Sequence, residues 1–140
     1  CHAASTGDLF KELIRVLRPG GAFVFTDIMG AEGADENVLK DFTDRNATTK
    51  MARPMEYLKL LKETGFKQGS FLDFSPHLDF YFQSMVDQIE KHWEDMLNEG
   101  CPETYLNKWV ASLNSRVHIQ KNHNVFAWGI FTARVEGPAY

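Results

Sequence analysis

The sequence predicts an α/β fold with about three strands and about five helices, and one stretch of chain carries most of that prediction. Between Leu13 and Asp27, an amphipathic helix stops at Pro19 and an apolar strand follows after two glycines. The glycines give the backbone the freedom for a tight reversal. Residues 22–25 show no polar alternation, which is typical of a strand covered on both faces by helices. A helix that leads into such a strand indicates a helix-covered sheet.

The elements around this stretch follow from periodicity and from helix-ending residues. The first helix is expected from Ser5 or Thr6, either of which can cap it, to about Arg18. The first strand is expected at about 22–28. The polar loop 30–35 then lies where a lid or substrate loop would lie. A short helix with inward-facing apolar residues follows. The apolar residues of these two helices are Leu9, Phe10, Leu13, Ile14 and Leu17 in the first, and Val38, Leu39 and Phe42 in the second.

The middle of the chain predicts one more helix and a second strand. Pro54 is suited to the first position of a helix, and Gly65 to its carboxyl end. Residues 67–74 alternate as a strand does, and Pro76 breaks it. The predicted buried stripe of the helix is Met55, Leu58 and Leu61.

The remaining chain is predicted to be mostly helical before a last strand. Apolar residues recur every three or four positions from Leu78 to Leu97, which predicts one long helix. Pro102 begins the next helix, and residues 125–135 form the last strand. We expect residues 1–140 to be a single domain with a helical insertion at about 76–121. The predicted inward residues of the last helix are Tyr105, Leu106, Trp109, Val110 and Leu113.

Two segments carry a family resemblance. The segment "LFKELIRVLRPGGAFVFTDIM" resembles the second half of a class I S-adenosylmethionine-dependent methyltransferase. The segment "NKWVASL…NVFAWGIFTARV" is similar to the last helix and strand of sarcosine/dimethylglycine and phosphoethanolamine N-methyltransferases. The resemblance implies a Rossmann-like sheet in which the last strand lies antiparallel between the other two. The helical insertion before that strand is shared with the small-amine branch.

The cofactor-binding features of that family are missing from this sequence. Its ten glycines nowhere form G-x-G-x-x-G. We therefore expect the chain to be a C-terminal portion, a truncated fragment of a methyltransferase. S-adenosylmethionine would then be held mostly by the N-terminal half, so its contact residues are unknown here, and this chain alone should not bind it tightly.

The resemblance also suggests which residues bind the methyl acceptor or remove its proton. His2 matches a histidine that assists amine deprotonation in the phosphoethanolamine branch, and an imidazole has a suitable pKa for that role. Asp27 lies at the carboxyl end of a buried strand, where its carboxylate could orient an ammonium group, or could instead order a loop. Met29 would line the pocket. Tyr81 lies off the apolar stripe of its helix and is expected in the pocket wall, where ring faces attract methylated ammonium.

One difference from the phosphoethanolamine branch narrows the choice of methyl acceptor. That branch has a lysine for the phosphate three residues after the tryptophan that matches Trp109, and here the position is Ser112. A smaller or carboxylated amine such as sarcosine or dimethylglycine fits better. Arg53 or Arg116 could pair with a carboxylate, although the spacing selects neither. Two alternatives stay open: a methyltransferase for sterols or other small molecules, suggested by Cys1-His2-Ala3, and a non-catalytic module that binds a ligand or dimerises.

Composition and charge argue against several other classes of protein. The net charge of −4 argues against a nucleic-acid partner, and no apolar run is long enough to span a membrane. The histidines show no ligand spacing, so no metal site is expected. Cys1 and Cys101 give no disulfide framework, which favours a cytoplasmic protein. The strand that ends at Asp27 would lack its usual neighbour. Its open edge predicts a dimer or larger homo-oligomer.

Overall fold

The computed structural model describes residues 5–46, 48 and 50–137, and the chain divides into two compact units. The first unit is Cys1–Ser75 with Val125–Tyr140, and the second is Pro76–Asn124. The first unit contains the sheet, whereas the second is helical. In the part of the chain that is described, no helix is long and apolar enough to cross a membrane.

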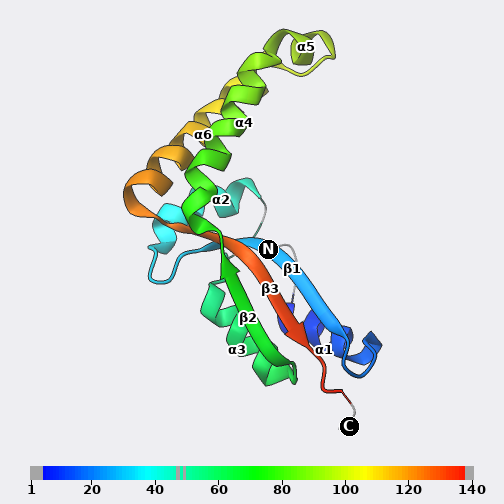
Figure 1. The fold of residues 1–140 in the computed structure, drawn as a ribbon. Helices are drawn as coiled ribbons and strands as arrows, with labels where there is room; N and C mark the ends of the chain where they lie inside the picture. Colours follow the sequence, from blue (N-terminus) through cyan, green and yellow to red (C-terminus); the bar gives the residue numbers. More distant parts are fainter. Residues whose placement is uncertain (1–4, 47, 49, 138–140) are drawn as a thin grey trace. The chain divides into compact units, whose positions relative to one another are not determined.

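The sheet of the first unit has three strands in the order β1-β3-β2. They are β1 (Ala22–Gly30), β2 (Lys67–Asp73) and β3 (Phe126–Arg134), and both outer strands pair antiparallel with β3. Figure 1 shows β3, in orange, between the blue β1 and the green β2. The prediction that the last strand inserts antiparallel between the other two is confirmed, and so is the α/β class.

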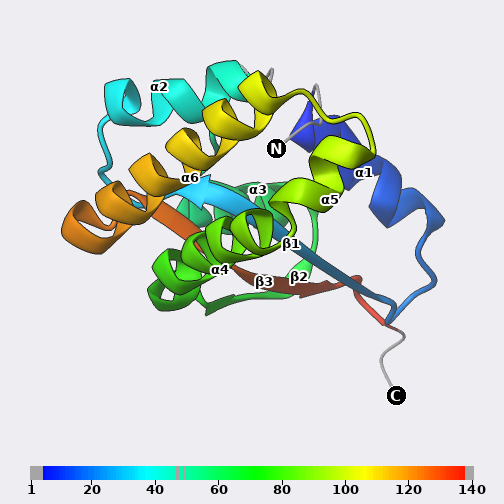
Figure 2. The ribbon, with the colours of Figure 1, turned by 90° about the horizontal axis from the view of Figure 1, so that it is seen from above.

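Three helices belong to the first unit: α1 (Thr6–Val16), α2 (Glu36–Arg45) and α3 (Pro54–Thr64). Ser5 caps α1, since its side chain accepts a hydrogen bond from the backbone N–H of Asp8. Helices α1 and α3 lie on the same side of the sheet (Figures 1 and 2). The core between these helices and the sheet consists of Phe10, Met29, Tyr57, Leu61, Phe66, Ala127, Phe131 and Ala133.

The strand β1 is covered on one face only among the described residues. Phe23 and Phe25 face α1 and α3, but Val24 is 59% exposed, and so is Leu72 of β2, at 58%. The prediction of a strand covered on both faces is therefore wrong for this part of the chain. A strand with apolar side chains on both faces shows no apolar–polar alternation in its sequence. The sequence pattern therefore does not tell whether helices cover the second face.

Helix α3 buries only part of the predicted stripe. Leu61 is buried as predicted, and Leu58 packs partly buried against the core. Met55 is 60% exposed, however, and Pro54 and Tyr57 are buried in addition to Leu61. The predicted end is confirmed, because Gly65 takes a left-handed conformation with φ of 107°. Apolar residues on α3 span more than one face, so periodicity alone did not decide which face meets the sheet. In α2, likewise, Leu39 is buried as predicted and Val38 is exposed.

The second unit pairs α4 (Leu78–Lys91) with α6 (Glu103–His123), and α5 (Trp93–Asn98) lies between them in sequence. The predicted single long helix is broken at His92, whose φ of −106° and ψ of 20° leave the helical range. The described chain therefore has six α-helices, with one 3-10 turn at Ser75–His77, instead of about five helices.

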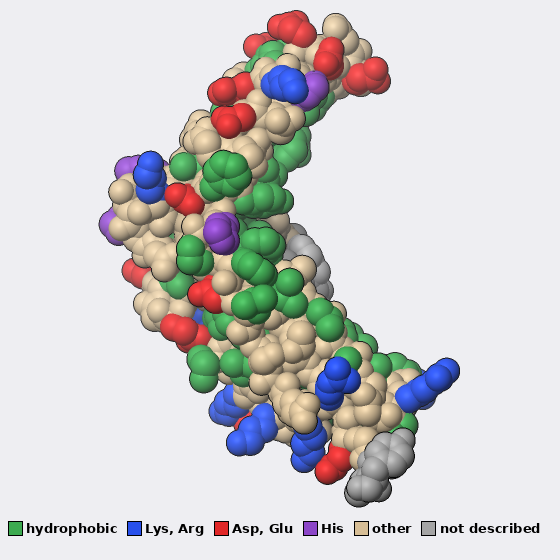
Figure 3. Space-filling model, in the orientation of Figure 1, with side chains coloured by type: hydrophobic (Ala, Val, Ile, Leu, Met, Phe, Trp, Pro, Cys, Tyr) green, Lys and Arg blue, Asp and Glu red, His purple; other side chains and the backbone are tan. Residues whose placement is uncertain are grey.

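The two ends of the broken helix differ in burial and in charge. In α4, Leu78, Phe82, Val86 and Ile89 are buried, as the stripe predicts. No residue of α5 is buried, and acidic side chains gather around it (Figure 3).

In α6, Leu106 and Leu113 are buried. Tyr105 was predicted to face inward, but it is 56% exposed, because it lies one position from the packed row of this helix.

Candidate acceptor site

The polar centre of the first unit is a hydrogen bond between Tyr57 and Asp27. The phenol of Tyr57 in α3 donates to Oδ2 of Asp27 in β1 over 2.6 Å. Asp27 lies near the carboxyl end of its strand, opposite Gly129 of β3. Ligands of α/β sheets bind at this end of the strands. The bond therefore holds a carboxylate where a ligand is expected.

Local packing fixes the position of Tyr57. Pro54 begins α3, and Tyr57 lies one turn later on the buried stripe. Its ring centroid lies 5.3 Å from those of Phe25 and Phe131, nearly perpendicular to the first. Edge-to-face rings of this kind pack favourably and leave few orientations for the side chain. The hydroxyl is therefore delivered to Asp27 by a rigid aromatic group.

Burial raises the pKa of the Tyr57 phenol above its ordinary value, and the hydrogen bond to Asp27 raises the pKa further. Near neutral pH the phenol is therefore protonated and acts as a hydrogen-bond donor. Its role beside Asp27 is to orient the carboxylate rather than to accept a proton.

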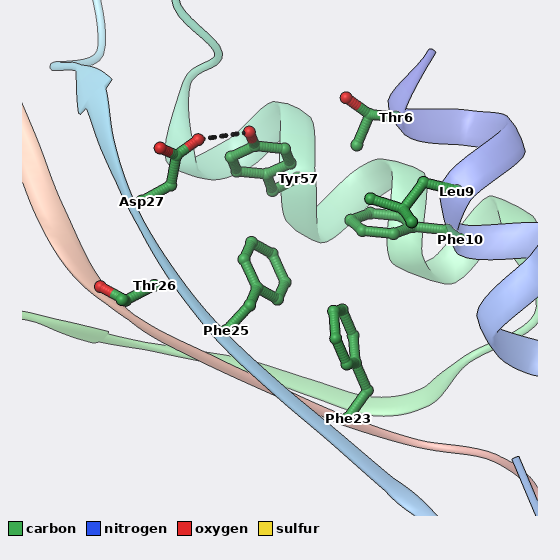
Figure 4. A pocket seen from close by; sticks show the side chains of 8 residues that line it. All are labelled: Thr6, Leu9, Phe10, Phe23, Phe25, Thr26, Asp27 and Tyr57. Carbon is green, nitrogen blue, oxygen red and sulfur yellow. Dashed lines mark hydrogen bonds between the residues drawn. The ribbon is translucent and has the colours of Figure 1, made fainter. Parts of the chain in front are cut away.

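A cavity of about 120 Å³ opens beside this pair, between α1, α3 and β1. Figure 4 shows Tyr57 and the phenylalanines around it, with the Asp27 carboxylate at one end. Apart from Tyr57, Asp27 is the only lining residue with an ionisable side chain, and no Lys, Arg or His lines the cavity in the described part of the chain. The lining residues are Thr6, Leu9, Phe10, Phe23, Phe25, Thr26, Asp27 and Tyr57.

Arg53 holds the segment that follows β1. Its Nη2 donates to the carbonyl oxygen of Ala34 over 2.9 Å and pairs with Glu36 at 2.6 Å. Its Nη1 is buried against Gly30, where a Cβ would lie only 1.5 Å away. Glu32 also accepts a hydrogen bond from the backbone N–H of Met55, at the start of α3. Arg53 is thus committed to holding this loop, so it is poorly placed to bind a substrate carboxylate.

The other cation suggested by the sequence lies in the second unit. The Arg116 guanidinium carbon is 6.0 Å from the centroid of the Phe82 ring, within range of a cation–π contact. Ser112, one turn earlier on α6, is 5% exposed. A side chain this buried within the helical unit is not placed to meet a phosphate.

The predicted site residues lie in different parts of the chain. Asp27 lines the cavity, and Thr26 donates to the carbonyl oxygen of Gly129 over 2.7 Å. Met29 is 0% exposed and belongs to the core beneath the strand. Tyr81 is 47% exposed on α4, in the second unit. His2 lies outside the described residues.

Sequence reasoning missed Tyr57, whose hydroxyl donates a hydrogen bond to Asp27. One signal could have indicated it. Tyr57 is three residues after Pro54 and four before Leu61, so the three share a helical face. A tyrosine on a buried face needs a partner for its hydroxyl, and an acid after a predicted buried strand is a suitable one.

The raised pKa of Tyr57 leads to a measurable prediction. In the unfolded chain a tyrosine ionises near pH 10, whereas the folded state keeps Tyr57 protonated to higher pH. Its contribution to stability is therefore complete below about pH 10 and is lost as the pH rises through the folded pKa. The free energy of unfolding should fall more steeply above pH 10 in the wild type than in Tyr57→Phe, by up to about 1.4 kcal/mol per pH unit. Urea unfolding at several pH values measures both slopes, and equal slopes would contradict the prediction.

Comparison with known proteins identifies the fold. The structure aligns with S-adenosyl-L-methionine-bound phosphoethanolamine N-methyltransferase 2 of Haemonchus contortus with a TM-score of 0.81. The alignment covers 96% of this chain and 31% of that protein, at 20% sequence identity. This is a methyltransferase fold. A second structure of the same enzyme aligns equally well, with a TM-score of 0.82, and holds phosphomonomethylethanolamine and S-adenosylhomocysteine.

The chain is also similar in sequence to methyltransferases named for small amines. The chain is 29% identical over 133 residues to a sarcosine/dimethylglycine N-methyltransferase of Halorhodospira halochloris. It is 28% identical over 129 residues to one of Aphanothece halophytica. The alignments cover 95% and 92% of this chain but only 47% and 46% of the relatives, so the chain spans about half their length. No protein-family model matches the chain.

Proposed function

We propose that this chain is the acceptor-side part of an S-adenosylmethionine-dependent N-methyltransferase that acts on a small amine, sarcosine or dimethylglycine. The observation that carries the proposal is similarity along more than nine-tenths of the chain to relatives of that name. The fold agrees with it. We further propose that the two compact units belong to one methyltransferase domain, in which Pro76–Asn124 is a helical insertion.

Methyl transfer to an amine needs alignment and exclusion of water more than it needs charged groups. The nucleophilic nitrogen must approach the methyl carbon in line with the leaving sulfur. The Asp27 carboxylate, oriented by Tyr57, would hold an ammonium group at the end of β1. The bound ammonium, secondary or tertiary, must lose its N–H proton before the nitrogen lone pair can attack the methyl carbon, and His2 would accept that proton. Met29 would support Asp27 from the core.

The residues described here do not fit the methyl donor itself. The cavity beside Asp27 holds about 120 Å³, whereas pockets for drug-sized ligands hold roughly 300–1,000 Å³. In the described chain, the turn from β1 into α2 contains Gly30 and Gly33 but not the G-x-G-x-x-G pattern that binds nucleotide-like cofactors. We propose that the remainder of a longer protein binds S-adenosylmethionine.

The open edge of β1 supports a proposal about assembly. In the described sheet β1 pairs with β3 alone, so its other edge is unpaired there. Unpaired edges favour pairing with another strand. We propose a homodimer of the 140-residue chain, in a cytoplasmic protein. Light scattering should give twice the chain mass, and a monomer would contradict the dimer.

A methyl-transfer assay tests the proposed function. The protein that contains this chain, extended to the length of the relatives, should transfer label from methyl-labelled S-adenosylmethionine to sarcosine or dimethylglycine in preference to phosphoethanolamine. Transfer to a sterol instead, or to no acceptor, would contradict the proposal.

Asp27→Asn should lower kcat/KM about tenfold to a hundredfold, since hydrogen bonds to charged groups contribute about 1.5–3 kcal/mol. Glu63→Gln makes the same charge change on the exposed face of α3 and is the control. An Asp27→Asn enzyme as active as this control would remove Asp27 from the site.

A further inference from the structure

We propose that a second cavity, at the opposite end of the sheet from Asp27, is a binding site for a phosphate group, either free phosphate or the end of a small phosphate monoester. This cavity holds about 270 Å³ and lies where β1 and β2 begin and β3 ends. Its lining includes Lys67, Gln68, Arg134 and Glu136. The proposal does not rest on the proposed function, since among the described residues this cavity and the acceptor site share no lining side chain.

The register of the sheet brings two cations together at this cavity. Lys67 of β2 and Arg134 of β3 are direct cross-strand partners. Like charges at such a position repel each other and destabilise the strand pair. In the described part of the chain, neither side chain forms an ion pair with an acid. A bound anion with two negative charges would therefore relieve a repulsion that the fold leaves uncompensated.

The Arg134 guanidinium presents donors suited to phosphate. Its Nη1 donates to the carbonyl oxygen of Gly20 over 3.4 Å, which holds it beside the turn before β1. A guanidinium has five N–H donors in a planar fork, and this single bond is the one that Arg134 makes to the residues described. The fork matches two oxygens of a phosphate, and the Lys67 ammonium adds a compact second charge.

An irregularity in β2 adds a neutral donor to the wall. Between Lys67 and Ser70 the pairing with β3 shifts in register. Within this irregularity Gln68 takes a left-handed conformation with φ of 53°, which is uncommon for a residue other than glycine. Strained backbone of this kind is frequent where a protein binds a ligand. The amide of Gln68, which lines the cavity, is a suitable donor to a third phosphate oxygen.

Glu136 opposes the binding of an anion and so provides a sharp test. The two cations and this carboxylate give the lining a formal charge of +1. The backbone carbonyl of Glu136 accepts a hydrogen bond from the N–H of Gly20 over 3.2 Å, which holds the segment in place. Its carboxylate forms no ion pair with Lys67 or Arg134 among the contacts described. Removal of its charge should therefore strengthen the binding of phosphate.

The size of the cavity and its surroundings agree with a small anion. Its volume of about 270 Å³ lies just below the roughly 300–1,000 Å³ of pockets for drug-sized ligands. A phosphate group with a few further atoms is thus a suitable occupant. Lys and Arg side chains gather around the end of the sheet where β2 begins and β3 ends (Figure 3). Such a concentration of positive charge attracts anions from solution.

The test is a titration of the ¹⁵N-labelled 140-residue chain with inorganic phosphate, glycerol 3-phosphate or chloride. The backbone amide resonances of Gly20 and Glu136 are followed by NMR at constant low ionic strength, because salt screens exposed charges. We expect both phosphates to shift these resonances saturably, about tenfold more tightly than chloride, since two charges and a donor fork face the ligand. Tighter binding of glycerol 3-phosphate would identify a monoester as the ligand, and tighter binding of inorganic phosphate the free anion. The amide resonances of Asp27 and Tyr57 should not move.

Variants then assign the effect to the lining. Lys67→Gln and Arg134→Gln should each weaken phosphate binding about fivefold, because a charge-assisted hydrogen bond is lost at an exposed, salt-screened site. Glu136→Gln should strengthen it about twofold to fivefold, because a repelling charge is removed. Lys40→Gln makes the same charge change as Lys67→Gln on exposed α2 and should bind phosphate as the wild type does.

These side chains are exposed, so the variants are expected to fold, and unchanged amide resonances away from the cavity check this. Equal affinity for phosphate and chloride, or shifts confined to residues away from the cavity, would overturn the proposal. Wild-type affinity in Lys67→Gln or Arg134→Gln, or no gain in Glu136→Gln, would overturn it as well.

Discussion

Phe131→Ala is expected to lower the free energy of unfolding by about 3–5 kcal/mol, as is usual for a buried phenylalanine. Phe131 is 0% exposed in the central strand. Its ring stacks on Phe25 at 4.7 Å and on Phe71 at 4.5 Å, so it joins the three strands through one layer of rings. It also packs against Tyr57, so its loss should loosen the hydrogen bond to Asp27. Urea denaturation followed by circular dichroism measures the loss.

The control for this variant lies on the opposite face of the same sheet. Leu72 of β2 is 58% exposed, so Leu72→Ala should change stability by about 0.5 kcal/mol or less. If the two variants lost equal stability, the assignment of one covered and one open face would be wrong.

Gly129→Ala is expected to cost about 3 kcal/mol even though it adds a single methyl group. A Cβ at Gly129 would lie 2.2 Å from the carbonyl oxygen of Leu72 and 2.5 Å from the Phe71 ring. The first of these atoms belongs to the backbone of β2, so the contact is relieved only if the strand moves. Overpacking of this kind typically costs about 1–3 kcal/mol, and backbone displacement places this variant at the upper end. Thermal unfolding compared with the wild type measures the cost.

A second glycine provides the matched control. Gly69 lies on β2, where the nearest atom to an added Cβ would be Cδ2 of Leu58 at 3.9 Å. Gly69→Ala should therefore be neutral or stabilise slightly, because alanine restricts the unfolded chain. Should Gly69→Ala prove as costly as Gly129→Ala, the close approach of β2 to Gly129 would not be the cause.

The sequence predicted those parts of the fold that local chemistry controls. Pro54 and Gly65 begin and end α3, and the apolar row from Leu78 to Ile89 gives α4. Each of these signals acts within one or two helical turns, so no knowledge of the neighbouring elements was needed. The central antiparallel position of β3 came from the family resemblance, since strand order depends on contacts between distant residues.

The features that could not be predicted from the sequence depend on contacts between elements that are distant in the chain. Met55 and Tyr57 both fit a helical stripe, and only the position of the sheet decides that Tyr57 is the buried one. The contact from Tyr57 to Asp27 joins residues 30 positions apart. A periodic pattern along one helix contains no information about such a partner. Asp27 was predicted from its place at the carboxyl end of a strand, whereas Tyr57, which orients its carboxylate, could be identified only from the fold.

The central claim of this account is that these 140 residues form the acceptor side of a methyltransferase whose donor is bound elsewhere. Calorimetric titration of S-adenosylhomocysteine into the 140-residue chain, and into a longer protein that contains it, tests this directly. The account predicts no measurable binding by the chain alone and micromolar binding by the longer protein. Micromolar binding by the 140-residue chain would contradict it.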